Sequence, residues 1–492
     1  MLFSSPRFLL FLAVVLVVLA PPYSHVIKKR ILSVASSFFY AAWDVRYLGL
    51  LLFISVVDWF VANRIAATDD RRARRRWLVV SLVSNLGLLG YFKYANFFLD
   101  NLNGVLAPLG HSFPHLDVIL PAGISFYTFK TLSYTIDVYR GALPVCRSVL
   151  DYTMFVTFFP ELIAGPIVRA SVFFPQMRRP IGPTTARMVS GLSLFLLGMT
   201  KKRLIADTAA AVADPVFANP GQYDGVALWF GLLAYAIQIY GDFSGYSDMA
   251  IGCARMIGYD LPENFAMPYL STNITEFWRR WHMTLSSWLR DYLYIPLGGN
   301  RHGPARTYVN LFLTMLLGGL WHGASWNFVL WGGLHGTALA VHKLWRKSVR
   351  WQMPPALGWA LTLVFAALCW VPFRAQTLGQ TATMLGRMFG LAGDGFHWVP
   401  ALAIAATVLV VAGHVIGAGL EQAAAAQRAG RTHPAAGMLA WLGFRLEVNE
   451  ISGWWVVFGS GSVLGVAAVA FWLLTLFFFA RANTSPFIYF QF

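Results

Sequence analysis

The chain has 492 residues, of which 57% are hydrophobic and only 12% charged, with a formal net charge of +16. A soluble chain of this length carries about 25% charged residues, so long stretches of this one must face something other than water. The positive charge does not indicate a nucleic-acid-binding protein, because Lys and Arg gather in short clusters between apolar stretches, as in Lys28–Arg30 and Lys343–Arg350. Such clusters are typical of the cytoplasmic loops of membrane proteins.

Several apolar stretches come close to the length that crosses roughly 30 Å of hydrocarbon as a helix. A backbone in lipid must satisfy its own hydrogen bonds, which predicts an all-α polytopic membrane protein. The first stretch is interpreted as a retained helix rather than a cleaved signal peptide, because further stretches follow at once. The positions of the basic clusters place the N-terminus outside. The stretches in chain order are Phe8–Ala20, Leu48–Ala66, Trp77–Phe98, Val226–Tyr240, Leu357–Cys369, Ala401–Leu420 and Leu464–Ala480.

The organisation predicted is a single membrane domain over residues 1–492, without internal repeats. The polar stretches are short, and the Ala/Gly/Gln-rich Glu421–Pro434 is predicted to be a flexible loop. Between residues 116 and 345 the apolar character is broken repeatedly by Gly, Pro, His, Arg and Asp. Such residues are costly in lipid, so the chemistry is expected in this part of the chain. The three cysteines are far apart and indicate neither a disulfide framework nor a metal site.

The first candidate motif is Asn273–Arg301, interpreted as an amphipathic helix that Thr272 or Asn273 caps. His282 lies on its apolar face with Trp278, Trp281, Leu285, Trp288 and Leu289. An interfacial helix with a structural histidine explains this pattern at least as well as a catalytic one.

The second candidate motif surrounds His322, which lies in an apolar run between Trp321 and Trp326. A histidine in a dry segment needs a partner, and its near-neutral pKa suits the deprotonation of a hydroxyl nucleophile. Ser325 is a candidate cap for a helix from Trp326 to Trp345. The sequence leaves open whether His322 lies beside the start of that helix or ends the preceding one, and whether it is a base or a structural residue.

The third candidate cluster, Tyr240–Asp248, contains Asp242 and several hydroxyl groups. A structural polar network is its default interpretation, and no metal site is predicted from it or elsewhere. The sequence contains no H-E-x-x-H, no G-x-S-x-G and no P-loop, which counts against zinc proteases, serine hydrolases and ATP-driven pumps.

Two of these segments, WRRWHMTLSSWLRDYLYIPLGGNR and GGLWHGASWNFVLWGGLHG, resemble the signature segments of membrane-bound O-acyltransferases. The closer resemblance is to the bacterial branch that acetylates alginate and related exopolysaccharides. The three supporting segments are LPAGISFYTFKTLSYTIDVYRG, FFPELIAGPIVR and QIYGDFSGYSDMAIG, and the closing SPFIYFQF also fits that branch. Five ordered segments are far more specific than either histidine motif alone.

This resemblance implies a ring of about eleven tilted helices around a central funnel. It implies transfer of an acetyl group from cytoplasmic acetyl-CoA, with no permanently bound cofactor. His322 matches the principal catalytic histidine of the family and His282 the second one. The acceptor implied is an exopolysaccharide hydroxyl or a periplasmic partner transferase, and the location is the bacterial inner membrane. Residues expected to bind donor or substrate are Asn273, Trp278, Arg279, Arg280, Trp281, Tyr294, Arg301, Trp321, Trp326, Tyr240 and Asp242.

In that scheme Arg279, Arg280 and Arg301 suit the phosphates of coenzyme A, although topology or lipid contact explains them equally well. Lys130 and Glu161 stand where the family pattern has Gln, and we expect them to contact each other, because a buried charge is tolerable when paired. The alternative functions are acylation of a cell-wall polymer or lipid, transport, and a structural role in an export complex. A transporter should show paired helix breaks in two related halves, and the sequence has none.

Overall fold

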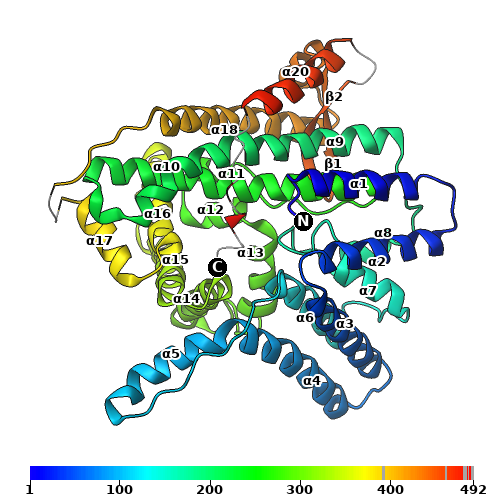
Figure 1. The fold of residues 1–492 in the computed structure, drawn as a ribbon, viewed down its shortest axis with the longest axis horizontal. Helices are drawn as coiled ribbons and strands as arrows, with labels where there is room; N and C mark the ends of the chain where they lie inside the picture. The colour runs from blue at the N-terminus through cyan, green and yellow to red at the C-terminus, as the bar shows by residue number, and fades with distance from the viewer. Residues whose placement is uncertain (391–393, 460–462, 480–484, 486, 489–492) are drawn as a thin grey trace. The chain divides into compact units, whose positions relative to one another are not determined.

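The computed structural model describes residues 1–390, 394–459, 463–479, 485, 487 and 488. They form two compact units, residues 1–188 with 253–261 (unit 1) and residues 189–252 with 262–492 (unit 2). The boundary between the units falls inside two helices, α9 (Thr185–Thr200) and α11 (Gly225–Ile257). Helices account for most described residues (Figure 1), which confirms the all-α prediction. The ring of helices stays a prediction, as does the single domain.

Unit 1 is built around a cluster of phenylalanine rings. Phe8 of the first helix packs edge-on against Phe39 at 5.9 Å between centroids, and Phe11 packs edge-on against Phe159 at 5.1 Å. The Ser5 side chain caps that first helix, and Pro6 occupies its first turn, where a missing N–H costs nothing. The elements are α1 (Pro6–Leu19), α2 (His25–Ala41), α3 (Val45–Ala66), α4 (Arg71–Leu89), η1 (Gly90–Tyr94), α5 (Ala95–Leu106), η2 (Ala107–Leu109), α6 (Ile124–Arg140), α7 (Val149–Thr157) and α8 (Ala170–Gln176).

The predicted contact between Lys130 and Glu161 is confirmed in unit 1. The Lys130 ammonium on α6 forms an ion pair with the Glu161 carboxylate, and both residues are almost completely buried. The ammonium also donates to the Phe155 carbonyl and lies 4.4 Å from the centroid of the Phe155 ring. The pair therefore compensates two charges that would each be costly alone.

Unit 2 holds the remaining elements, together with the larger parts of α9 and α11. The segments labelled η3 and η6 are π-helical turns, which are frequent at functional sites. The further elements are η3 (Lys201–Ala206), α10 (Asp207–Ala218), η4 (Pro220–Gln222), η5 (Pro268–Leu270), α12 (Ile274–Arg280), α13 (Met283–Leu289), η6 (Arg290–Tyr294), α14 (Gly303–His322), α15 (Trp326–Ser348), α16 (Pro355–Arg374), α17 (Leu378–Met388), α18 (Ala401–Arg428), α19 (Pro434–Trp441), β1 (Phe444–Asn449), β2 (Gly453–Phe458) and α20 (Val463–Phe479).

Glycines let α14 and α15 approach each other closely (Figure 1). A methyl group on Gly319 of α14 would collide with the Phe328 carbonyl, and one on Gly332 of α15 would collide with the Met315 carbonyl. The two backbones can therefore meet only if both positions lack a side chain. This packing fixes the end of α14, where His322 lies.

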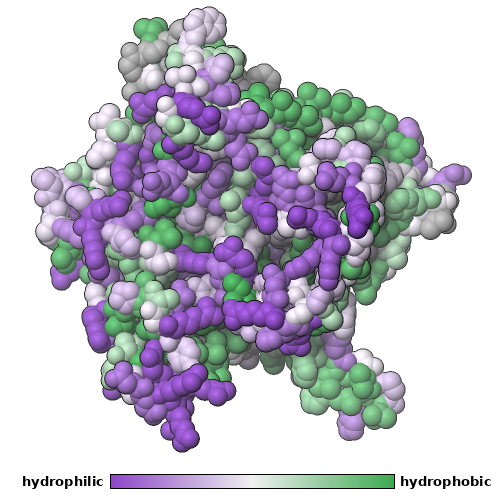
Figure 2. Space-filling view, turned by 180° about the vertical axis from the view of Figure 1, so that it is seen from behind, coloured by the Kyte–Doolittle hydropathy of each residue, from purple (hydrophilic) through white to green (hydrophobic). Residues whose placement is uncertain are grey.

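Among the described residues, five helices are long and apolar enough to cross a membrane: α3, the continuous stretch 71–109, α11, α16 and α18. The shorter apolar helices α1 and α20 fall on the two remaining predicted stretches, except for Ala480, which lies outside the described residues. Helix α18 exposes the apolar side chains of Val408, Val411 and Ile416, which is unfavourable in water but favourable in lipid. Figure 2 shows groups of hydrophobic residues on the surface beside hydrophilic ones, and large exposed apolar groups are typical of surfaces that do not face water. The chain is a multi-pass membrane protein.

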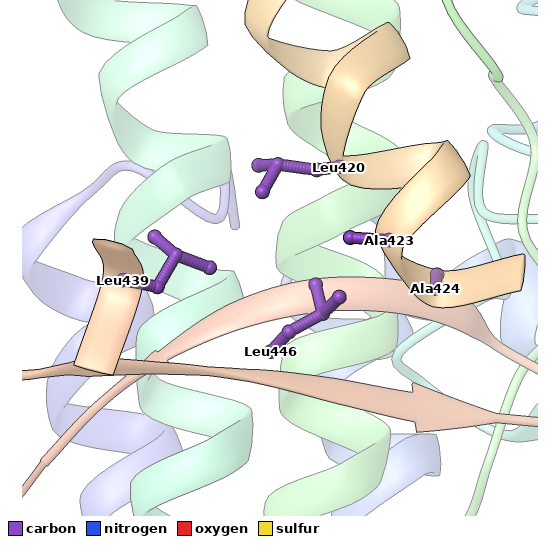
Figure 3. Packing of buried hydrophobic residues seen from close by; sticks show 5 residues of the cluster. All are labelled: Leu420, Ala423, Ala424, Leu439 and Leu446. Carbon is purple, nitrogen blue, oxygen red and sulfur yellow. The ribbon is translucent and has the colours of Figure 1, made fainter. Parts of the chain in front are cut away.

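The prediction of a flexible loop over Glu421–Pro434 is wrong for residues 421–428, which are helical. Helix α18 continues to Arg428, and α19 begins at Pro434. Alanine has the strongest helix propensity of all residues, and Ala423 and Ala424 are buried against Leu439 of α19 and Leu446 of β1 (Figure 3). Propensity and this small core together hold the segment helical.

Candidate active site

All the candidate catalytic residues lie in unit 2, and His282 lies at a break between two helices. The prediction of a single amphipathic helix from Asn273 onward is wrong, because α12 ends at Arg280 and a separate helix, α13, begins at Met283. The Asn273 side chain caps α12, as predicted, accepting from the Glu276 N–H at 2.9 Å. His282 has a φ of +43°, a left-handed conformation uncommon outside glycine and often found at functional sites.

The His282 ring is held in one orientation by Asn264. Nδ1 of His282 lies 3.0 Å from Oδ1 of Asn264, and the His282 residue is fully buried. The same Oδ1 accepts from the backbone N–H of Thr284 at 3.3 Å, so it is identified as the amide oxygen. Nδ1 must therefore be the donor, which leaves the lone pair of a neutral ring on Nε2.

His322 is the last residue of α14, which decides the question that the sequence left open. Ser325 is the N-cap residue of α15, as predicted, although its side chain makes no capping hydrogen bond. The buried His322 ring packs edge-on against Trp331 at 5.0 Å and Phe373 at 5.1 Å. Trp321 contacts both histidines, at 4.9 Å from His322 and 6.2 Å from His282. Trp326 is 54% exposed, unlike the buried Trp321.

A third histidine, His335 of α15, escaped the sequence analysis. It is fully buried, its ring packs on Trp331 at 4.7 Å, and its Nδ1 accepts a hydrogen bond from the Trp278 indole at 3.3 Å. It therefore belongs to the aromatic cluster that carries His322. The signal was present, because His335 follows Trp331 by four residues, which places both on one face of a helix.

A cavity of about 860 Å³ opens beside this cluster, and we call it the donor cavity. The predicted residues Trp278, Arg279 and Tyr294 line it. Its other cationic lining residues are Arg290, Lys343, Arg346 and Lys347, and no Asp or Glu is among the described residues that line it. Such a cavity attracts a polyanionic ligand.

Two aromatic contacts link the lining of the donor cavity to His322, which is not itself a lining residue. The ring of Trp278, which lines the cavity, lies 5.7 Å from the ring of Trp331. Trp331 in turn packs on His322. Trp281, the other predicted tryptophan of this segment, is buried and stacks on Phe277 at 5.6 Å.

Arg280 and Arg301 lie outside the donor cavity. The Arg280 guanidinium is bonded to Glu276 at 3.0 Å and to Glu421 at 3.1 Å, and Arg301 is exposed before α14. Burial acts to raise the pKa of Glu276, but hydrogen bonds from Thr272 and Arg280 outweigh it and hold that pKa below its usual value. Arg280 is thus committed to holding α12 in place, whereas Arg279 faces the donor cavity.

The Tyr240 and Asp242 cluster is a buried ionic network. Lys202 lies 2.8 Å from Asp242 and 3.0 Å from Asp207. The backbone N–H of Ile488, close to the C-terminus, donates to Asp242 at 2.7 Å. Tyr240 packs against the His414 ring at 4.8 Å, and Phe243, next to Asp242, packs edge-on against His282 at 4.6 Å. This network therefore supports the residues that pack behind His282 and holds Ile488.

The sequence matches the model of the membrane-bound O-acyltransferase (MBOAT) family over residues 142–378, a range that includes all three histidines. It is 46% identical to a probable alginate O-acetylase AlgI of Pseudomonas putida, over 75% of this chain and 76% of that protein. It is 42% identical to a peptidoglycan O-acetyltransferase of Helicobacter pylori, over 74% of each chain. A teichoic acid D-alanyltransferase of Bacillus subtilis is 27% identical over 53% of this chain.

Proposed function

The chain belongs to the membrane-bound O-acyltransferase family, and from that premise we propose that it transfers acetyl groups from acetyl-CoA to hydroxyl groups of an exopolysaccharide. Family membership and the apolar helices identify the chain as a membrane-bound O-acyltransferase. The acetyl donor, the polymer and the bacterial inner membrane as its location are the proposed parts.

One observation carries the proposal: two buried histidines share contact with Trp321, and two ring contacts link one of them to a cationic cavity that has no acidic residue among its described lining residues. Histidine is the side chain best suited to take a proton from a hydroxyl near neutral pH. Coenzyme A carries several phosphate charges, and Arg and Lys are the side chains that bind phosphate. The proposal therefore places the base and the polyanionic donor in the same part of unit 2.

In the proposed reaction His322 accepts the proton of the acceptor hydroxyl as its oxygen attacks the thioester carbonyl. A new C–O bond forms, the C–S bond breaks, and the coenzyme A thiolate leaves and takes the proton back from the imidazolium. Trp321, Trp331 and Phe373 surround His322 and keep water from hydrolysing the thioester.

Of the two roles expected for His282, we propose orientation of the acetyl donor and not stabilisation of an oxyanion. Asn264 fixes the hydrogen of a neutral His282 on Nδ1, so Nε2 can accept a hydrogen bond but not donate one. Stabilisation of an oxyanion requires a donor. We therefore assign His282 the task of orienting the donor by accepting a hydrogen bond from an N–H of the pantetheine arm.

The proposed acceptor is an alginate-like polymer, because the probable alginate O-acetylase of Pseudomonas putida matches three quarters of both chains. Peptidoglycan is the second candidate, on account of the Helicobacter pylori relative. Transfer through a periplasmic partner is also part of the proposal, and that partner would present the hydroxyl in place of the polymer.

Purified protein in proteoliposomes with acetyl-labelled acetyl-CoA tests the proposal. Base-labile label on polymannuronate, with release of coenzyme A, is the expected result, and label on peptidoglycan instead would move the acceptor to the second candidate. Arg279→Gln should raise the KM for acetyl-CoA about tenfold, whereas Arg301→Gln, the matched exposed control, should leave it within about twofold. If neither polymer is labelled even when a periplasmic fraction is added, the proposed acceptors are wrong.

A further inference from the structure

A second cavity, of about 760 Å³, lies between the end of α15 and the start of α16, and we call it the lateral groove. Cationic residues, tryptophans and aliphatic residues all line it. The residues that matter here are Val341, Trp345, Arg346, Arg350, Trp351 and Leu361.

The lining of the lateral groove is cationic, although Arg346 also lines a further cavity whose lining includes Glu276 and Glu421. No Asp or Glu is among the described residues that line it. Within the described part of the chain, neither Arg346 nor Arg350 forms an ion pair with a carboxylate, unlike Arg280, which has two. Two guanidinium groups that line one cavity, with no acidic residue among its described lining residues, favour a phosphate ligand, whose geometry Arg matches with two parallel hydrogen bonds.

The apolar lining residues of the groove show that a small soluble anion alone would not fill it. Val341, Trp351 and Leu361 all line the groove and are more than half exposed. Inorganic phosphate would contact the cationic residues and leave this apolar surface uncovered. A ligand with a phosphate head and a hydrocarbon chain satisfies both kinds of lining residue.

The position of the groove in the chain fits such a ligand. Helix α16 is a candidate membrane span that starts at Pro355, directly after the groove-lining segment. Trp345 and Trp351 pack edge-on at 6.0 Å, and tryptophans gather where lipid headgroups meet hydrocarbon. The basic cluster Lys343–Arg350 is typical of the cytoplasmic side, where anionic lipids attract Lys and Arg.

We propose that the lateral groove binds an anionic glycerophospholipid, with its phosphate between Arg346 and Arg350 and an acyl chain along Val341 and Leu361. The site is separate from the acetyl-transfer chemistry and does not depend on it. It is nevertheless adjacent, because Arg346 and His342 line both the groove and the donor cavity. His342 also bonds Thr275 of α12 at 2.8 Å, so the bound lipid supports one wall of the donor cavity.

Native mass spectrometry of the purified full-length protein tests the site, with phosphatidylglycerol and phosphatidylcholine of identical chains. The wild type should retain phosphatidylglycerol about tenfold more strongly. Arg350→Gln, which changes the groove alone, should remove most of that preference. Lys347→Gln is the matched control, because it removes the same charge from the same exposed region but lines only the donor cavity. Leu361→Gln should weaken retention of both lipids.

Four results would overturn the proposal. The first is equal retention of the two lipids by the wild type, and the second is equal loss of preference in Arg350→Gln and Lys347→Gln. The third is displacement of phosphatidylglycerol by soluble glycerol phosphate at matched concentration, which would identify a phosphate site without a lipid. The fourth is displacement by coenzyme A, which would make the groove an extension of the donor cavity. None of these readouts requires enzymatic activity, so failure here leaves the proposed function untouched.

Discussion

The buried ion pair between Lys130 and Glu161 gives a prediction with an internal check, because removing one partner strands the other. Lys130→Gln leaves a carboxylate that is 1% exposed without a cation, which should cost about 3–5 kcal/mol of unfolding free energy. Glu161→Gln leaves the Lys130 ammonium without its carboxylate, but the ammonium still contacts the Phe155 carbonyl and ring. These contacts should retain about 1–2 kcal/mol of the unfolding free energy. The Glu161 variant should therefore be the milder of the two.

The double variant Lys130→Gln/Glu161→Gln buries two neutral amides that can bond each other, so it should be more stable than either single variant. The coupling free energy from the four proteins should reach about 3 kcal/mol. The measurement is the free energy of unfolding in mixed detergent micelles. Additive costs would refute the ion pair as a stabilising unit, and equal costs of the two single variants would refute the contribution assigned to Phe155.

Three further predictions concern unit 2. Asn264→Ala frees the His282 ring and should lower kcat about 10- to 100-fold at unchanged folding, and normal turnover in that variant would contradict the assigned orientation. Gly332→Ala should lower the free energy of unfolding by about 1–3 kcal/mol, because the added methyl group would collide with the Met315 carbonyl. Gly333→Ala, whose methyl group has only ordinary contacts, should be neutral or stabilising in the same thermal unfolding assay. The pKa of Glu276 is lowered in the folded chain, so its contribution to stability is present at neutral pH and is lost as the pH falls through that lowered pKa. Thermal unfolding of the wild type should accordingly lose more stability below about pH 4 than that of Glu276→Gln.

Much of the fold could be predicted from local sequence. All seven apolar stretches fall on helices, because hydropathy over some twenty residues is a strong signal in a membrane protein. The cap at Asn273 also follows from local chemistry. The ion pair of Lys130 and Glu161 was predictable for another reason, namely that two isolated charges in apolar segments need each other.

What the sequence did not reveal depends on tertiary contacts. The helix break at His282 has no local signal, since neither Gly nor Pro stands there; the hydrogen bonds of Asn264 to His282 and Thr284 are formed across the fold. The bond from Ile488 to Asp242 joins residues far apart in the chain. Arg280 and Arg279 are adjacent and chemically identical. Arg280 bonds Glu276 and the distant Glu421, whereas Arg279 lines the donor cavity.

The central claim, acetyl transfer with His322 as the base, is tested most directly in proteoliposomes with labelled acetyl-CoA. The comparison is between wild type, His322→Ala and His111→Ala, an exposed histidine in unit 1, at matched folding. We predict a loss of about 10²- to 10⁴-fold in acetyl transfer for His322→Ala and wild-type activity for His111→Ala. Undiminished transfer by His322→Ala would contradict the account and move the base to another residue.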